Sequence, residues 1–197
     1  MSDMDLNVQT LNRALVDDLI ERARAAPRRR INHNFHASME DNPHRFLNVM
    51  AKGTYIAPHR HLNPPKAESF VVLEGEIAFF VFDDAGLVTR TEILGGDPIG
   101  IDLTPGVWHT LTPLSEHAVC YEVKPGPYSA ATDKDFAPWA PREGDPAAAA
   151  YLESLLQPLR SKPPITRLSS AESRCALSMP ARKVGQGTLR KRAMVTI

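Results

Sequence analysis

The sequence predicts an all-β domain, a sandwich or a jelly-roll barrel, with one helix before it and one after it. From about residue 45 to residue 123 the chain consists of short apolar runs rich in Val, Ile and Phe. Turn-forming residues separate these runs at intervals of about eight to twelve residues, and no helical periodicity is interleaved between them. The 197 residues, 43% of them hydrophobic, suffice for one domain with its own core.

Residues 10–26 predict an amphipathic helix. Leu11, Leu15 and Leu19 recur at helical spacing with charged residues between them, and Pro27 ends the segment. Residues 1–44 are therefore expected to form this helix and a strand leading into the barrel.

Seven apolar runs are the expected strands of a barrel spanning residues 45–128. They read RFLNVMA, SFVVLEG, EIAFFVF, LVTRTEIL, PIGID, VWHTLTPL and HAVCYEV. A Pro-rich connector and a helix follow within residues 129–157, because Asp145 and Pro146 suit the N-cap and first position of the Ala-rich stretch up to Leu156. Residues 158–197 have no sustained apolar period and are expected to be a disordered basic tail.

Composition excludes several classes of protein. The net charge is zero, but residues 158–197 hold nine basic side chains and one acidic one, which leaves the rest acidic and disfavours nucleic acid as its main partner. No apolar run is long enough to span a membrane, and no secretory signal is present, so a cytoplasmic protein is expected. Cys120 and Cys175 are the only cysteines, so a metal site would need His and carboxylate ligands.

Three histidines and one glutamate are the candidate metal ligands. His59 and His61 alternate along an extended segment, which turns both imidazoles to one side and Arg60 to the other. Glu68 shares a strand face with apolar residues and needs a partner there, and His109 follows a Thr-Pro-Gly turn on another apolar strand. Three imidazoles and a carboxylate suit one divalent ion such as Mn, Fe, Ni, Zn or Co.

These residues lie in two motifs that resemble those of the cupin superfamily. The first runs from Gly53 through His59, His61 and Glu68 to Gly75, and the second is the segment PGVWH ending at His109. The runs GTYIAPHRHLNPPKAESFVVLEG, TPGVWHTL and EVKPGPY, followed by KDFAPWAP, resemble the WbuC-type cupin-fold metalloproteins over about residues 8–157. Glu68 lies two residues later than in the broader cupin pattern, so the loop before it should be longer.

The resemblance implies a single cupin jelly-roll barrel that holds a metal ion inside it. It also implies a small-molecule substrate, with a carbohydrate or sugar acid suggested by the polysaccharide gene clusters in which WbuC-type proteins occur. Three functions stay open: a metal-dependent isomerase, epimerase or lyase, which is slightly favoured; an iron-dependent dioxygenase; and a non-catalytic binding or sensor module stabilised by metal.

The sequence also suggests substrate-binding residues, positions for the other histidines and an oligomeric state. Arg60, Lys66, Lys124 and Tyr128 are candidates for binding the substrate, through charge for the first three. The remaining histidines, His33, His36, His44 and His117, are expected at the surface or in hydrogen bonds, and His36 lies on a segment that could run along the barrel. Apolar residues on both faces of several strands favour a homodimer.

Overall fold

The computed structural model describes residues 8–160, which form ten strands and two helices. Their order is α1 (Arg13–Ala25), β1 (Arg30–Asn34), β2 (His44–Ala51), β3 (His59–Arg60), β4 (Glu68–Glu74), β5 (Ile77–Phe82), β6 (Val88–Leu94), β7 (Gly100–Leu103), β8 (Trp108–Pro113), β9 (His117–Lys124), β10 (Asp135–Phe136) and α2 (Ala148–Arg160). All seven predicted runs form strands, at β2 and β4 to β9.

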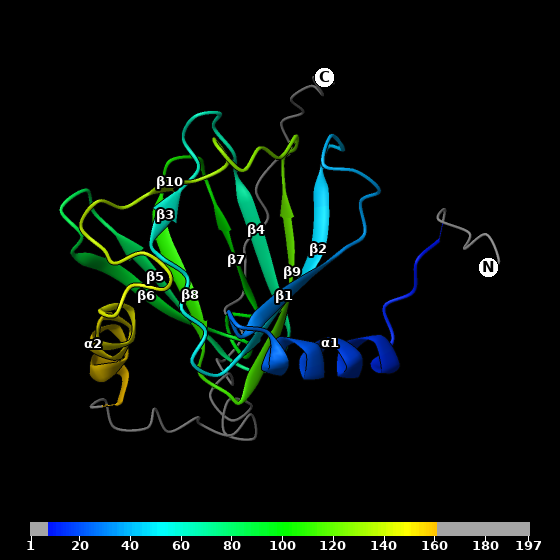
Figure 1. The fold of residues 1–197 in the computed structure, drawn as a ribbon, viewed down its shortest axis with the longest axis horizontal. Coiled ribbons are helices and arrows are strands. Elements are labelled where there is room, and N and C mark those ends of the chain that lie inside the picture. The colour runs from blue at the N-terminus through cyan, green and yellow to red at the C-terminus, as the bar shows by residue number, and fades with distance from the viewer. Residues whose placement is uncertain (1–7, 161–197) are drawn as a thin grey trace, which may run out of the picture. The chain divides into compact units, whose positions relative to one another are not determined.

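The strands form two antiparallel five-stranded sheets that face each other as a jelly-roll barrel (Figure 1). One sheet has the order β1-β2-β9-β4-β7 and the other β10-β3-β8-β5-β6. Alternate residues of both sheets meet in an apolar core, to which Met50 and Phe70 contribute from the first sheet and Phe79 and Leu111 from the second. The predicted all-β fold class, with one helix on either side of the barrel, is confirmed.

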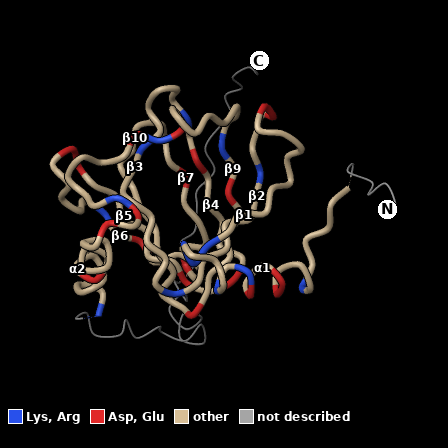
Figure 2. Tube along the Cα trace, viewed as in Figure 1, with Lys and Arg blue, Asp and Glu red and all other residues tan. Residues whose placement is uncertain are grey.

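Helix α1 covers the outer face of the first sheet over β1 and β2 (Figure 1). Asn12 caps it by accepting a hydrogen bond from the main-chain nitrogen of Leu15. Its buried residues Leu19 and Ala23 pack against Leu47 and other residues of the sheet. Acidic and basic side chains alternate along the rest of the helix (Figure 2), where ion pairs link successive turns.

Helix α2 covers the outer face of the second sheet. Leu155 packs against Phe80, Phe82 and Trp108. The helix passes through Pro158 and ends at Arg160, so the boundary at residue 158 expected for the tail falls inside it. Packing of the apolar side chains on the sheet, Leu159 included, outweighs the hydrogen bond that a proline removes from the last turn. The rest of the predicted tail, residues 161–197, lies outside the described residues.

Short strands at the sheet edges complete the barrel. Strand β1 is the expected lead-in strand and pairs with β2. Strand β10 lies in the segment predicted as a connector and pairs with β3, which brings Phe136 opposite His59. This pairing places the connector beside the segment that carries the predicted metal ligands.

The described residues also bear on the expectations for a membrane span, for the cysteines and for a homodimer. Within residues 8–160 no helix has the length and apolar character needed to cross a membrane. Cys120 is a buried free thiol, whereas Cys175 lies outside the described residues. Val71, Leu73 and Ile99 expose apolar surface near β4 and β7, and the homodimer stays a prediction.

Candidate metal centre

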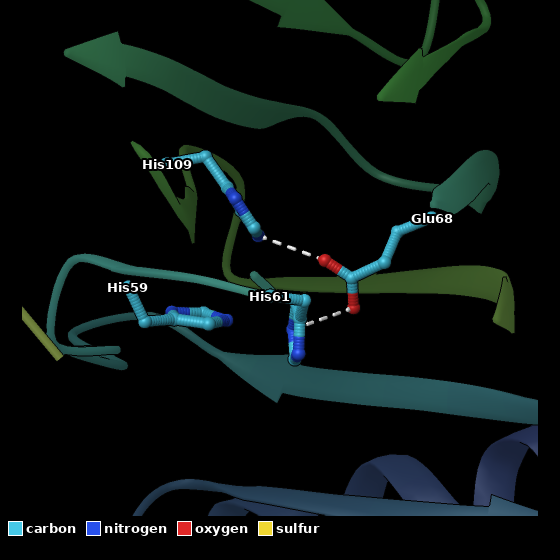
Figure 3. A group of neighbouring side chains, drawn as sticks. All are labelled: His59, His61, Glu68 and His109. Atoms are coloured by element: carbon cyan, nitrogen blue, oxygen red, sulfur yellow. Dashed lines mark ion pairs between the residues drawn. The ribbon is translucent and has the colours of Figure 1, made fainter. Parts of the chain in front are cut away.

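The four predicted metal ligands meet inside the barrel (Figure 3). His59 on β3 lies opposite His109 on β8, so the pairing of these strands sets the two imidazoles side by side. His61 follows β3 directly, and Glu68 opens β4 in the facing sheet. One donor atom from each residue lies within 4.8 Å of all the others, and all four side chains are buried.

Each histidine is held through its Nδ1 atom by a main-chain carbonyl. The Nδ1–H groups of His59 and His109 donate to the oxygens of Ala57 and Val107 at 3.0 and 2.9 Å. The Nδ1–H of His61 donates to the main-chain oxygen of Asp133. Because a carbonyl can only accept, Nδ1 carries the proton in each ring and Nε2 keeps the free lone pair that a metal ion needs.

The inward-facing atoms are arranged as donors to a cation. Nε2 of His61 and Nε2 of His109 each lie 3.1 Å from a carboxylate oxygen of Glu68 (Figure 3). Both Nε2 atoms are buried and neither makes a hydrogen bond. A nitrogen lone pair and a carboxylate oxygen at this distance repel each other unless a proton or a cation lies between them, so these residues fit a metal ion.

The surroundings favour the neutral form of His59 and the ionised form of Glu68, which are the forms that bind metal. Burial lowers the pKa of His59 well below its usual value, and the charge of Lys134 adds to this effect. Burial alone would raise the pKa of Glu68, but its contacts with His109 and His61 outweigh this and hold it well below the usual value. Phe79 stacks on His109 with 5.6 Å between ring centroids and fixes the plane of that imidazole.

The longer loop before Glu68 is accommodated by a small turn. Leu62 and Pro65 form an isolated β-bridge, which closes the turn within the loop. Gly106, in the turn before His109, donates its N–H to the main-chain oxygen of His61 at 3.1 Å and has φ +84°, which favours glycine. The two motifs are thereby tied together at the centre.

Asp133 links the metal ligands to two buried lysines. Its main-chain oxygen holds His61, and its carboxylate accepts hydrogen bonds from Lys66 at 2.8 Å and Lys124 at 3.1 Å. Lys124 also lies 3.7 Å from Glu68. Asp133 was not predicted from the sequence, because it lies 72 residues from His61 in a segment without a motif.

A cavity of about 500 Å³ adjoins this centre. Lys124, Asp133 and Phe136 line it and also contact the ligands, since the Phe136 ring lies 6.1 Å from that of His59. The four ligands themselves are not among its lining residues. Asn32 and Asn34 on edge strand β1 are exposed and line the cavity where it meets solvent.

Glu122 is a buried carboxyl group in the wall of the cavity. It accepts a hydrogen bond from Asn48 at 3.2 Å, and burial raises its pKa to about 7. It shares the inward face of β9 with Ala118, Cys120 and Lys124, so it is an acidic residue on a buried strand face. The same pattern, an acidic residue on an inward strand face, points to Glu68 in the sequence and could have identified Glu122.

The four predicted substrate-binding residues take different positions. Lys124 and Tyr128 line the cavity, and Tyr128 is partly exposed. Lys66 is buried on Asp133 and does not line the cavity. Arg60 points away from the metal ligands and packs over Trp108, with 4.2 Å from the guanidinium carbon to the ring centroid.

The other histidines divide between the surface and the cavity. His117 pairs with Glu74 at 2.7 Å at the surface, and His33 is half-buried on β1. His36 and His44 are buried, stack with 4.1 Å between centroids and line the cavity. Of the two expected settings these residues take the second, because Nδ1 of His36 lies 3.1 Å from the main-chain oxygen of Arg45 and Nε2 of His44 lies 3.0 Å from that of Met39.

Comparison by sequence gives one partial family match. Residues 11–94 match a family described as a domain of unknown function (DUF6016). The matched range contains three of the four candidate ligands and ends before His109. A search of curated proteins by sequence found no match.

Comparison by structure finds cupin-fold proteins at low sequence identity. The capsular polysaccharide assembling protein CapF from Staphylococcus aureus matches with 18% identity over 53% of this chain and 28% of its own, at a TM-score of 0.46. A variant of oxalate decarboxylase from Bacillus subtilis matches with 19% identity over 50% of this chain and 24% of its own, at 0.40. The chain thus spans less than a third of either protein, and the resemblance to the narrower WbuC type stays a prediction.

Proposed function

We propose that this chain is a metal-binding cupin that holds one divalent ion through His59, His61, Glu68 and His109. The observation that carries the proposal is the shared orientation of the histidines, whose Nδ1–H groups are all held by main-chain carbonyls while the donor atoms converge within 4.8 Å. Three neutral imidazoles and one carboxylate suit Mn, Fe, Ni or Zn better than Mg or Ca, which prefer oxygen ligands.

The proposed substrate is a small oxygen-rich molecule, such as a sugar derivative, bound in the adjoining cavity. The cavity wall is polar and charged, which supports a ligand with many hydrogen-bonding groups. A bound divalent ion would supply Lewis acidity to a substrate oxygen. Lys124 and Asp133 keep the cavity wall beside the ligands in place, and Phe136 limits the access of water to His59.

Glu122 favours proton-transfer chemistry, which is isomerisation, epimerisation or a lyase reaction. With a pKa near 7, its carboxyl group can both hold and release a proton at neutral pH. An iron-dependent dioxygenase does not need such a group, and it stays the alternative. Dependence on iron together with oxygen uptake would favour that alternative.

Metal analysis of purified protein tests the proposal. Untagged wild type is compared with His59→Ala, Glu68→Gln and the control His117→Ala, which removes a histidine at the surface. We expect about one ion per chain in wild type and control, and loss of about tenfold or more in affinity in the other two. Failure of wild type to bind Mn, Fe, Ni or Zn more tightly than His59→Ala would refute it.

A further inference from the structure

Three polar side chains in the wall of the cavity lack partners within the described residues. Nε2 of His36 and Oδ1 of Asn48 are buried and make no hydrogen bond, although both residues are more than nine-tenths buried. The ammonium group of Lys134 has no ion pair or hydrogen bond with any residue from 8 to 160. Buried polar groups normally have partners, so two such groups in one cavity wall, beside the unpaired ammonium group of the partly buried Lys134, indicate a missing ligand.

The other cations of the cavity wall are already paired. Arg28 and Arg30 share the carboxylate of Glu143 at 2.7 and 2.5 Å. Lys124 shares the carboxylate of Asp133 with Lys66, which lies just outside the wall. Asp133 and Glu143 are thus each divided between two basic groups, whereas Glu122 is bonded to Asn48. The wall holds four Lys and Arg side chains against three Asp and Glu side chains, which is a surplus of one positive charge.

The surplus charge falls on Lys134. The charges of Glu68 and Glu122 reach it but do not offset its burial, which together with Lys124 lowers its pKa. An unpaired cation in such a place is costly, and an anion beside it would remove that cost by favouring the charged form. A ligand with one negative charge would therefore be stabilised beside the ammonium group of Lys134.

The two other groups define complementary hydrogen-bonding positions. Nδ1 of His36 lies 3.1 Å from the main-chain oxygen of Arg45 and 3.2 Å from its main-chain nitrogen, so both tautomers of the ring have a partner there and Nε2 can donate or accept accordingly. Asn48 donates its amide N–H to Glu122, which leaves its Oδ1 as an acceptor. A hydroxyl group both donates and accepts, so it can bond to Nε2 of His36 in either tautomer and can donate to Oδ1 of Asn48.

We propose that the cavity binds a small polyhydroxylated carboxylate, with its carboxylate at Lys134 and its hydroxyl groups at His36 and Asn48. The inference rests on the proposed function in taking this cavity as the substrate site of the metal centre. One free ammonium matches the single charge of a carboxylate, whereas a phosphate dianion would need a second free cation. Lys134 lies next to Asp133, which holds His61, so the anion would bind beside the centre.

Calorimetric titration of the full chain with three probes tests this ligand class. D-Gluconate carries both a carboxylate and hydroxyl groups, D-glucitol lacks the carboxylate, and hexanoate lacks the hydroxyl groups. Lys134→Met is compared with Lys134→Arg, which keeps the charge, and with Lys52→Met, which removes a surface lysine paired with Glu116. Metal content and circular dichroism are recorded before and after each titration, because gluconate can chelate metal.

We expect wild type to bind gluconate about tenfold or more tightly than either other probe, because glucitol loses the charged hydrogen bond to Lys134 and hexanoate loses the hydrogen bonds to His36 and Asn48. Lys134→Met should lose about tenfold or more in gluconate affinity, Lys134→Arg should retain part of it, and Lys52→Met should match wild type. Equal binding of gluconate and glucitol by wild type, or undiminished gluconate binding by folded Lys134→Met, would overturn the inference.

The metal measurements separate this inference from the proposed function. Metal-loaded protein that does not discriminate between the probes refutes the carboxylate subsite and leaves the metal centre intact. Protein that binds no metal, yet binds gluconate in a manner dependent on Lys134, supports the subsite and refutes the metal centre.

Discussion

Replacing Asp133 with Asn should destabilise the barrel and weaken metal binding. The substitution keeps the shape of the side chain but removes the charge that Lys66 and Lys124 share. These lysine side chains are only 3% and 8% exposed, so water cannot replace the carboxylate. Breaking a buried ion pair costs about 3–5 kcal/mol. The amide oxygen of Asn still accepts one hydrogen bond, so we expect a loss of about 3 kcal/mol, near the lower end.

Urea denaturation in EDTA measures this loss without a contribution from metal. A loss of about 3 kcal/mol corresponds to a fall in Tm of about 6–12 °C for a domain of this size. The control is Asp135→Asn, because that carboxylate is 45% exposed and lies 3.7 Å from its partner Arg60. We expect the control to cost at most about 1 kcal/mol. If both variants lose the same stability, the assignment of Asp133 as a buried hub is refuted.

The pH dependence gives a second check on Asp133. Burial alone would raise its pKa, but Lys124 and Lys66 outweigh burial and hold the pKa below the ordinary value of 3.8. The stability from the ionised group is therefore complete above that value and is lost as the pH falls through the folded pKa. The difference between wild type and Asp133→Asn should shrink below about pH 4. Metal affinity at pH 7 should fall by about tenfold or more, because the segment that orients His61 loosens.

Three further predictions concern other parts of the barrel. Gly75→Ala should lower the free energy of unfolding by about 3 kcal/mol, because a Cβ there meets the main-chain oxygen of His117. Gly144→Ala has a similar φ but open space around the Cβ, and should lower it by about 1 kcal/mol. Equal losses of stability in the two variants would contradict this. In metal-free wild type, the folded pKa of Glu122 exceeds its unfolded pKa, so the free energy of unfolding should fall by up to about 3 kcal/mol as the pH rises from about 4.5 to 8. Glu122→Gln should not show this fall, because glutamine does not titrate. A pH profile parallel to wild type would exclude this assignment. Arg60→Ala should cost at most about 1 kcal/mol and leave metal content and gluconate affinity unchanged, since its contact with Trp108 lies outside the cavity; a loss of gluconate binding would restore Arg60 as a binding residue.

The strands and the ligand set were accessible from the sequence because they depend on local patterns. Period-two alternation and turn residues identify β2 and β4 to β9, and the alternation of His59 with His61 places both rings on one side. That Glu68 and His109 meet this pair depends on strand pairing, which local patterns do not show. The resemblance to the cupin motifs predicted this meeting from the sequence.

The residues that contact the candidate ligands or line the cavity could not be predicted from the sequence, because their positions depend on pairing between distant segments. Strand β10 has only two residues, and the pairing of Asp135 with Arg60 joins segments 75 positions apart in the sequence. Asp133 and Lys134 acquire their roles only through that pairing. His36 and His44 lie in sequence without strand or helix periodicity. They are buried in the wall of a cavity that no local sequence pattern predicts.

The position of the candidate ligands in both sheets makes metal binding and folding a single equilibrium. Glu68 belongs to one sheet and His59 and His109 belong to the other, so the sheets cannot separate while one ion is bound to all three. At a free metal concentration of about 100 times Kd, this linkage adds about 2.7 kcal/mol to the free energy of unfolding. The denaturation midpoint of this protein would then serve as a gauge of the metal concentration around it.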